Sequence, residues 1–99
     1  MNEETTAERV RRQMPDENPE ALFADGFDDA IVGIARRCGQ PSLVAYSYAR
    51  GIAVLVADDM TYEDAVEWME FNVVGAWMGP HTPVWIMDEP EAYAGSTSE

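Results

Sequence analysis

The chain has 99 residues, of which 46% are hydrophobic, and its formal net charge is −13. This length and apolar content suit one folded domain and argue against a disordered chain. The charge disfavours direct binding to nucleic acid or to an anionic membrane, and no apolar run reaches the roughly 18 residues of a membrane-spanning helix.

The N-terminal residues 1–20 are polar, and we predict a flexible or weakly helical segment. Thr5 and Glu8 have the spacing of a capping box, and Glu8 lies four residues before Arg12, the spacing of an ion pair on a helix. Met14-Pro15 is expected to end this helix. No apolar stripe is evident, so we expect the segment to contribute nothing to the core. The predicted domain spans 21–93 and is followed by a disordered tail, 94–99.

The middle of the chain predicts a β-hairpin. Residues 30–37 and 42–48 are rich in β-branched and aromatic residues and are separated by the turn sequence CGQP. The next segment, 48–57, fits two structures. Its valines favour a strand, whereas Tyr48, Ile52 and Leu55 recur at helical spacing after a possible cap, Ser47.

The clearest predicted element is a helix over 62–78. Thr61 is a suitable N-cap, and Asp64 occupies the third helical position, a variant of the capping box. Gly79-Pro80 is expected to end the helix, and 82–87 then reads as an edge strand because Pro83 cannot donate to a sheet. The expected fold is therefore α+β in ββααβ order: a small antiparallel sheet, made of hairpin 30–48 and strand 82–87, packed with two helices.

This helix has two unlike halves. In its first half, the acids Glu63, Glu67 and Glu70 lie on the face opposite an apolar stripe. Beyond Glu70 it is apolar nearly all round, apart from Asn72, which we expect to be buried and hydrogen-bonded. One chain of this size cannot cover such a helix end together with Trp77, so the sequence predicts a homodimer.

Two separated motifs, DGFDDAIVG near residue 25 and MTYEDAVEWMEFNVVGAW followed by TPVW, occur in order. In these motifs the chain resembles a family of small proteins of tailed bacteriophages and prophages, over about residues 25–87. The resemblance implies a viral origin, a location in the cytoplasm of an infected cell and a ββααβ arrangement. It implies no reaction.

Candidate chemical sites are sparse. Asp25, Asp28 and Asp29 could hold a hard cation, but their spacing is not that of an EF-hand, and a structural turn explains them more simply. His81 is the single histidine and has no nucleophile or second ligand near it in sequence. The single cysteine, Cys38, cannot form an internal disulfide, which is typical of a reducing compartment. With no phosphate-binding or zinc motif, we expect no cofactor and no metal, we assign no catalytic residue, and we favour a binding role over an enzymatic one.

Three functional hypotheses follow. The first is an accessory protein that binds and modulates a host protein with a basic surface, since no cation follows Arg50. The second, a narrower form of the first, is a DNA mimic that uses Glu63, Glu67 and Glu70. The third is a ligand-binding or enzymatic protein with a pocket at a homodimer interface. The residues that would take part in these contacts are Glu63, Glu67, Glu70, Asn72, Trp77 and His81.

Overall fold

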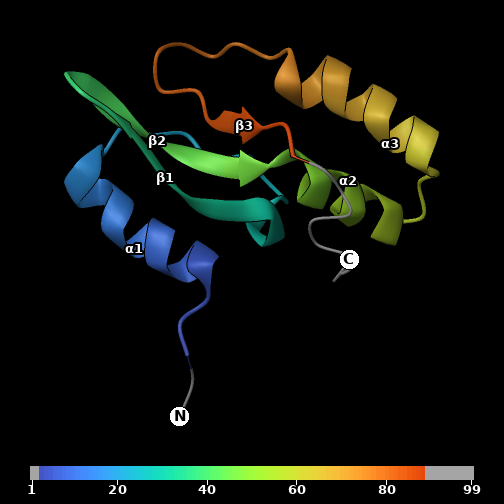
Figure 1. The fold of residues 1–99 in the computed structure, drawn as a ribbon, viewed down its shortest axis with the longest axis horizontal. Coiled ribbons are helices and arrows are strands. Elements are labelled where there is room, and N and C mark those ends of the chain that lie inside the picture. The colour runs from blue at the N-terminus through green and yellow to red at the C-terminus, as the bar shows by residue number, and fades with distance from the viewer. Residues whose placement is uncertain (1–2, 89–99) are drawn as a thin grey trace.

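The computed structural model describes residues 3–88 and has the predicted α+β class, with the ββααβ order preceded by an N-terminal helix (Figure 1). The elements are α1 (Thr6–Glu17), β1 (Ile31–Arg37), β2 (Gln40–Ser47), α2 (Tyr48–Ala57), α3 (Tyr62–Met69) and β3 (Val84–Ile86). A 3₁₀ turn precedes β1 and a π-helical turn follows α3, at Asp28–Ala30 and Glu70–Val74. The predicted tail, 94–99, and the last residues of the predicted domain, 89–93, lie outside the described residues.

The sheet is mixed, with strand order β1-β2-β3. The predicted hairpin is confirmed: β1 and β2 pair antiparallel, and the turn between them uses Gly39 at a φ of +74°, which favours glycine. β3 instead pairs parallel to β2, with Tyr46 opposite Trp85. The expectation of a wholly antiparallel sheet is therefore wrong. The reason is the crossover through α2 and α3, which returns the chain to the sheet in the direction of β2.

The N-terminal helix α1 starts at the predicted capping box. The Glu8 N–H donates to Thr5 Oγ1 at 3.1 Å, and Glu8 Oε1 accepts from the Thr5 N–H at 2.9 Å. The helix continues through Pro15 to Glu17, beyond the predicted end. Arg12 pairs with Glu4, through two hydrogen bonds of 2.6 and 2.8 Å, rather than with Glu8.

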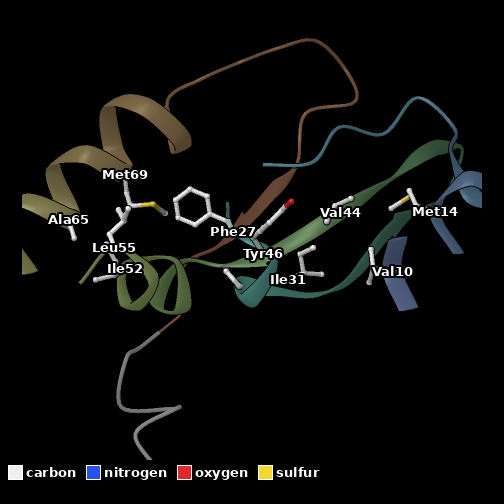
Figure 2. Close-up of a cluster of buried hydrophobic side chains, with 11 residues drawn as sticks. Val10, Met14, Phe27, Ile31, Val44, Tyr46, Ile52, Leu55, Ala65 and Met69 are labelled. Atoms are coloured by element: carbon white, nitrogen blue, oxygen red, sulfur yellow. The ribbon is translucent and has the colours of Figure 1, made fainter. Parts of the chain in front are cut away.

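One continuous core joins α1, one face of the sheet and the α2–α3 pair (Figure 2). Val10 and Met14 of α1 are each 1% exposed, so the expectation that the N-terminal segment adds nothing to the core is wrong. Ala7 packs against the same core, so α1 presents a short apolar stripe of three residues at helical spacing that the prediction overlooked. The other buried members of the cluster are Phe27, Ala30, Ile31, Val44, Tyr46, Ile52, Leu55, Ala65 and Met69.

The ambiguous segment 48–57 is the helix α2. The Ser47 hydroxyl accepts the Arg50 N–H at 3.0 Å and itself donates to Asp88 Oδ2 at 2.7 Å. Asp88 Oδ1 also accepts the Ala49 N–H at 2.8 Å, so a residue that follows β3 helps to cap α2. These bonds satisfy the N–H groups of Ala49 and Arg50 in the first turn of α2, which have no partner within the helix.

The helix predicted over 62–78 is shorter than expected. Its start is confirmed, because the Asp64 N–H donates to Thr61 Oγ1 at 3.1 Å. The α-helix ends at Met69 and continues as the π-helical turn, which closes with the Gly75 N–H on the Glu70 carbonyl at 3.2 Å. A Cβ on Gly75 would lie 2.9 Å from that carbonyl oxygen. Residues 76–83 are therefore a loop rather than a helix end.

Candidate functional site

A pocket of about 240 Å³ lies where residues 22–27 meet two neighbouring segments from the C-terminal half of the described chain. Residues 22–27 form one wall, α3 with its π-helical turn forms another, and the segment 76–85 forms the third. We call it the aromatic pocket. Its lining is mainly apolar and includes Leu22, Phe27, Trp68, Val73, Met78 and Trp85, with Asp25, Asn72 and Thr82 as its polar members.

Stacked rings line the aromatic pocket. The parallel register places Trp85 beside Tyr46, and the two rings stack at 4.7 Å between centroids. Phe27 meets Trp85 edge-on at 5.6 Å and lies 6.2 Å from Trp68. Aromatic pairs at these separations prefer offset or edge geometries and add about 0.5–1.5 kcal/mol each beyond burial. These contacts give the pocket fixed walls.

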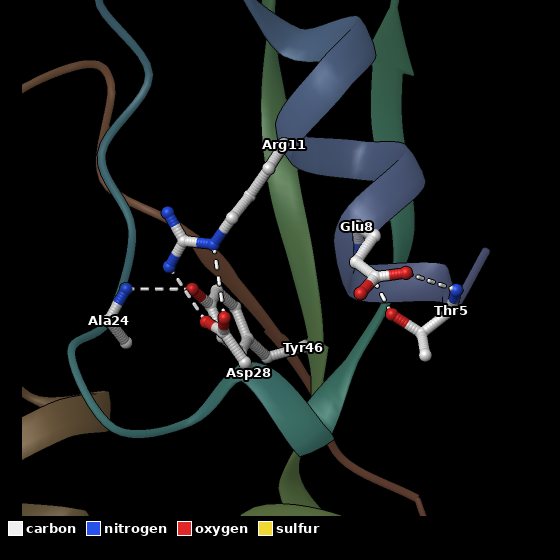
Figure 3. A network of polar contacts seen from close by, with 6 residues as sticks. All are labelled: Thr5, Glu8, Arg11, Ala24, Asp28 and Tyr46. Atoms are coloured by element: carbon white, nitrogen blue, oxygen red, sulfur yellow. Dashed lines mark hydrogen bonds and ion pairs between the residues drawn. The ribbon is translucent and has the colours of Figure 1, made fainter.

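Hydrogen bonds hold the wall formed by residues 22–27 (Figure 3). The Ala24 N–H donates to the hydroxyl oxygen of Tyr46 at 2.7 Å, and burial raises the pKa of that hydroxyl. Arg11 donates to Asp28 through two bonds of 3.1 and 2.7 Å and also covers the Phe23 ring at 4.2 Å. The α1 helix thereby fixes the segment that closes one side of the pocket.

Large apolar side chains are exposed around the aromatic pocket and the adjoining loop. Phe71 is 78% exposed, Trp77 is 76% exposed and Met78 is 70% exposed. Isolated exposed apolar residues are common, but three large ones within residues 71–78, next to a pocket, make this region a candidate interaction site. The predicted apolar helix end is thus left uncovered by the described part of the chain.

A second depression, of about 430 Å³, adjoins the aromatic pocket and shares Trp68 and Asn72 with it. We call it the acidic hollow. Its carboxylates come from Asp59, Asp64 and Glu67, and Phe71 forms part of its lining. Asp64, Glu67 and Trp68 of α3 and Phe71 and Asn72 of the π-helical turn have neighbours three or four residues away, so successive turns present them on one side.

The three predicted partner-binding acids lie in different environments. Glu67 lines the acidic hollow, whereas Glu63 is exposed on α3 outside it. Glu70 accepts a hydrogen bond from the Tyr48 hydroxyl at 2.8 Å. Burial of that hydroxyl, together with its bond to Glu70, raises the pKa of Tyr48 to about 12. Glu70 therefore has a structural role in joining α2 to the π-helical turn.

Asn72 is exposed, contrary to the expectation of a buried asparagine. Its side-chain amide donates to the Trp68 carbonyl at 3.2 Å, one turn earlier in the helix. The reason for the exposure is the early end of the helix, which leaves this turn at the surface. Asn72 consequently borders both the aromatic pocket and the acidic hollow.

Trp77 and His81 line neither the aromatic pocket nor the acidic hollow, both of which Asn72 borders. Trp77 lines a separate depression with Arg37 and Pro80 near the hairpin turn. His81 is partly buried: its Nδ1 lies 3.0 Å from the Asn18 amide nitrogen, and its Nε2 lies 3.1 Å from Glu20 Oε1. Donation from the Asn18 amide requires a histidine tautomer with its proton on Nε2, which can donate to Glu20. His81 thus ties the loop to the segment after α1.

The aspartates near residue 25 have separate environments. Asp28 is paired with Arg11, and the hydrogen bonds from that guanidinium lower the pKa of the carboxyl. Asp25 borders the aromatic pocket, and Asp29 is exposed in the 3₁₀ turn. Among residues 3–88 no group of three or more histidine, cysteine or acidic side chains is arranged to hold a metal ion.

Sequence reasoning missed most of the aromatic pocket, including Leu22, Met78 and the placement of Trp85. The acidic hollow had a detectable signal, because its α3 members share one helical face. Comparison with protein-family models, with curated proteins and with solved structures finds no match to this chain. Within residues 3–88, no helix has the length and apolar character needed to cross a membrane.

Proposed function

We propose that this chain is a small acidic accessory protein, of the tailed-phage type that its sequence motifs resemble, which binds and modulates a host protein in the cytoplasm. The observation that carries the proposal is the exposure of Phe71 and Met78 around the aromatic pocket, beside the acidic hollow. Interfaces typically place apolar and aromatic anchors at the centre and polar groups at the rim. We call the surface made of the pocket, the hollow and these two side chains the α3 face.

The charge of the chain indicates the kind of partner. A net charge of −13 attracts a partner with a basic surface and accelerates encounter with it at low salt. From residue 51 to 88 the sequence has no lysine or arginine to neutralise the acids around this face. The DNA-mimic form of the hypothesis needs an extended row of acids, whereas α3 has 8 residues. We therefore favour recognition centred on apolar contacts, with the acids as its rim.

The proposal is tested by using the purified chain to capture proteins from host lysate, followed by measurement of the affinity for the captured partner. Phe71→Ala and Met78→Ala should each weaken binding, since truncation of a central anchor commonly costs over 1 kcal/mol, or about five-fold. Met87→Ala is the matched control, because Met87 is 62% exposed but does not border the pocket. Equal affinity of all three variants and the wild type would refute a site on the α3 face.

A homodimer remains a second proposal, and the exposure of Trp77 favours it. This side chain shares its depression with Arg37, a cation that an acidic residue of a second copy could approach. Light scattering across a concentration series tests this proposal. A dimer that Trp77→Ala dissociates would support it, whereas a monomer at the highest soluble concentration would refute it.

A further inference from the structure

We infer that the α3 face binds one short segment of the partner, in which a large apolar side chain enters the aromatic pocket and a neighbouring arginine or lysine enters the acidic hollow. This inference rests on the proposed partner-binding function. It adds the chemical pattern that the partner must present, and it assigns separate roles to the two depressions.

The size and walls of the aromatic pocket define the first half of the pattern. A volume of about 240 Å³ is below the roughly 300–1,000 Å³ typical of sites for small molecules. It suits a single side chain better than a cofactor. The Phe27 ring contacts the rings of Trp68 and Trp85, and all three line the pocket, so an apolar group would be desolvated against fixed aromatic walls.

The acidic hollow defines the second half. Within the described residues, Asp59, Asp64 and Glu67 take part in no ion pair with an arginine or histidine. The rings of Trp68 and Phe71 border the same depression. A guanidinium or ammonium group would meet carboxylates and aromatic rings together, which is the environment that favours cation–π contacts. A neutral or acidic side chain would gain neither interaction.

The two depressions are adjacent, which limits the spacing in the partner. Trp68 and Asn72 border both of them, so the two occupants would lie beside the same two residues. Side chains three or four residues apart on a helix have Cβ atoms about 5–6 Å apart, and alternate residues of a strand are about 7 Å apart. One short segment can therefore fill both sites with neighbouring side chains.

The experiment selects randomised short peptides on the immobilised full-length chain and measures the affinity of the enriched peptides by fluorescence anisotropy. Enriched sequences should combine a large apolar residue with arginine or lysine two to four positions away. Glu67→Gln should weaken their binding about two- to five-fold, as expected for a partly exposed ion pair. Glu63→Gln is the matched control: it makes the same charge change on the same helix, outside the hollow.

Each outcome bears on the inference. Enriched peptides without a cation, or equal effects of Glu67→Gln and Glu63→Gln, would overturn it while leaving the α3 face as a possible site for a folded partner. A lack of enriched peptides would also overturn it if Met78→Ala still weakens capture of a host protein. If Met78→Ala weakens neither the binding of peptides nor the capture of a host protein, the proposed function fails as well.

Discussion

The sharpest structural prediction concerns Gly51 in α2. In an ordinary helix interior, replacement of glycine by alanine gains about 1 kcal/mol of stability. Here a Cβ would lie 2.9 Å from Met69 Cε and 3.0 Å from Trp85 Cζ3. Met69 Cε is the end of a flexible side chain and is the easier neighbour to displace, but Met69 is fully buried and Trp85 is stacked on Tyr46, so the displaced atoms must be accommodated within the core.

Overpacking of this kind costs about 1–3 kcal/mol, so Gly51→Ala should be destabilising by about 0–2 kcal/mol in spite of its better helix propensity. Urea unfolding followed by circular dichroism measures the change. Met69→Leu removes the Cε atom, and the cost of Gly51→Ala should be smaller in that background. A Gly51→Ala protein that is about 1 kcal/mol more stable than the wild type would show that the helix pairing has room, and would refute the packing argument.

Further predictions test the elements around this core. Met14→Ala should destabilise the protein by about 2–5 kcal/mol in denaturant unfolding, because α1 is part of the core. Thr61→Ala should cost about 0.5–2 kcal/mol by loss of the α3 cap, and an unchanged denaturation midpoint would contradict this. The hydrogen bonds from Arg36 and then Ser42 lower the pKa of Glu17 from 4.5 to about 2, so its stabilisation is present above pH 4.5 and is lost as pH falls toward 2. The substitution Arg36→Gln should raise the pKa of Glu17, and a carboxyl titration followed by NMR measures this change. The pKa of Tyr48 is raised from 10.0 to about 12, so its stabilisation is present below pH 10 and is lost as pH rises toward 12. Tyr48→Phe should accordingly lose less stability than the wild type over that alkaline range.

The sequence by itself determined the features that depend on neighbours a few residues apart. The caps at Thr5 and Thr61 each join a side chain to a backbone N–H three residues later, so the residue types at these positions predict them. Ser47 caps α2 in the same way, but the sequence leaves 48–57 open between a helix and a strand. The hairpin turn at Gly39 is local in the same way, because its left-handed conformation favours glycine. The α+β class and the order of the elements followed from these signals.

Only the tertiary structure decided how the helix after Thr61 ends. Its apolar sequence continues to Met78, but the backbone turns into a π-helical turn that closes on Gly75. The direction of β3 was likewise undetermined in sequence, because edge strands of both directions have similar residues. Its pairing with β2 depends on the path of the whole α2–α3 crossover.

The candidate site shows the same division. Glu67 is identified in sequence as an acid on one face of the predicted helix, and Asn72 as the polar residue in an otherwise apolar stretch; both border the acidic hollow. The aromatic pocket could not be found, because Phe27 meets Trp68 and Trp85 there from a segment far away in the sequence. Spacing along a chain predicts contacts within one element, whereas contacts between elements depend on the packing of the complete core.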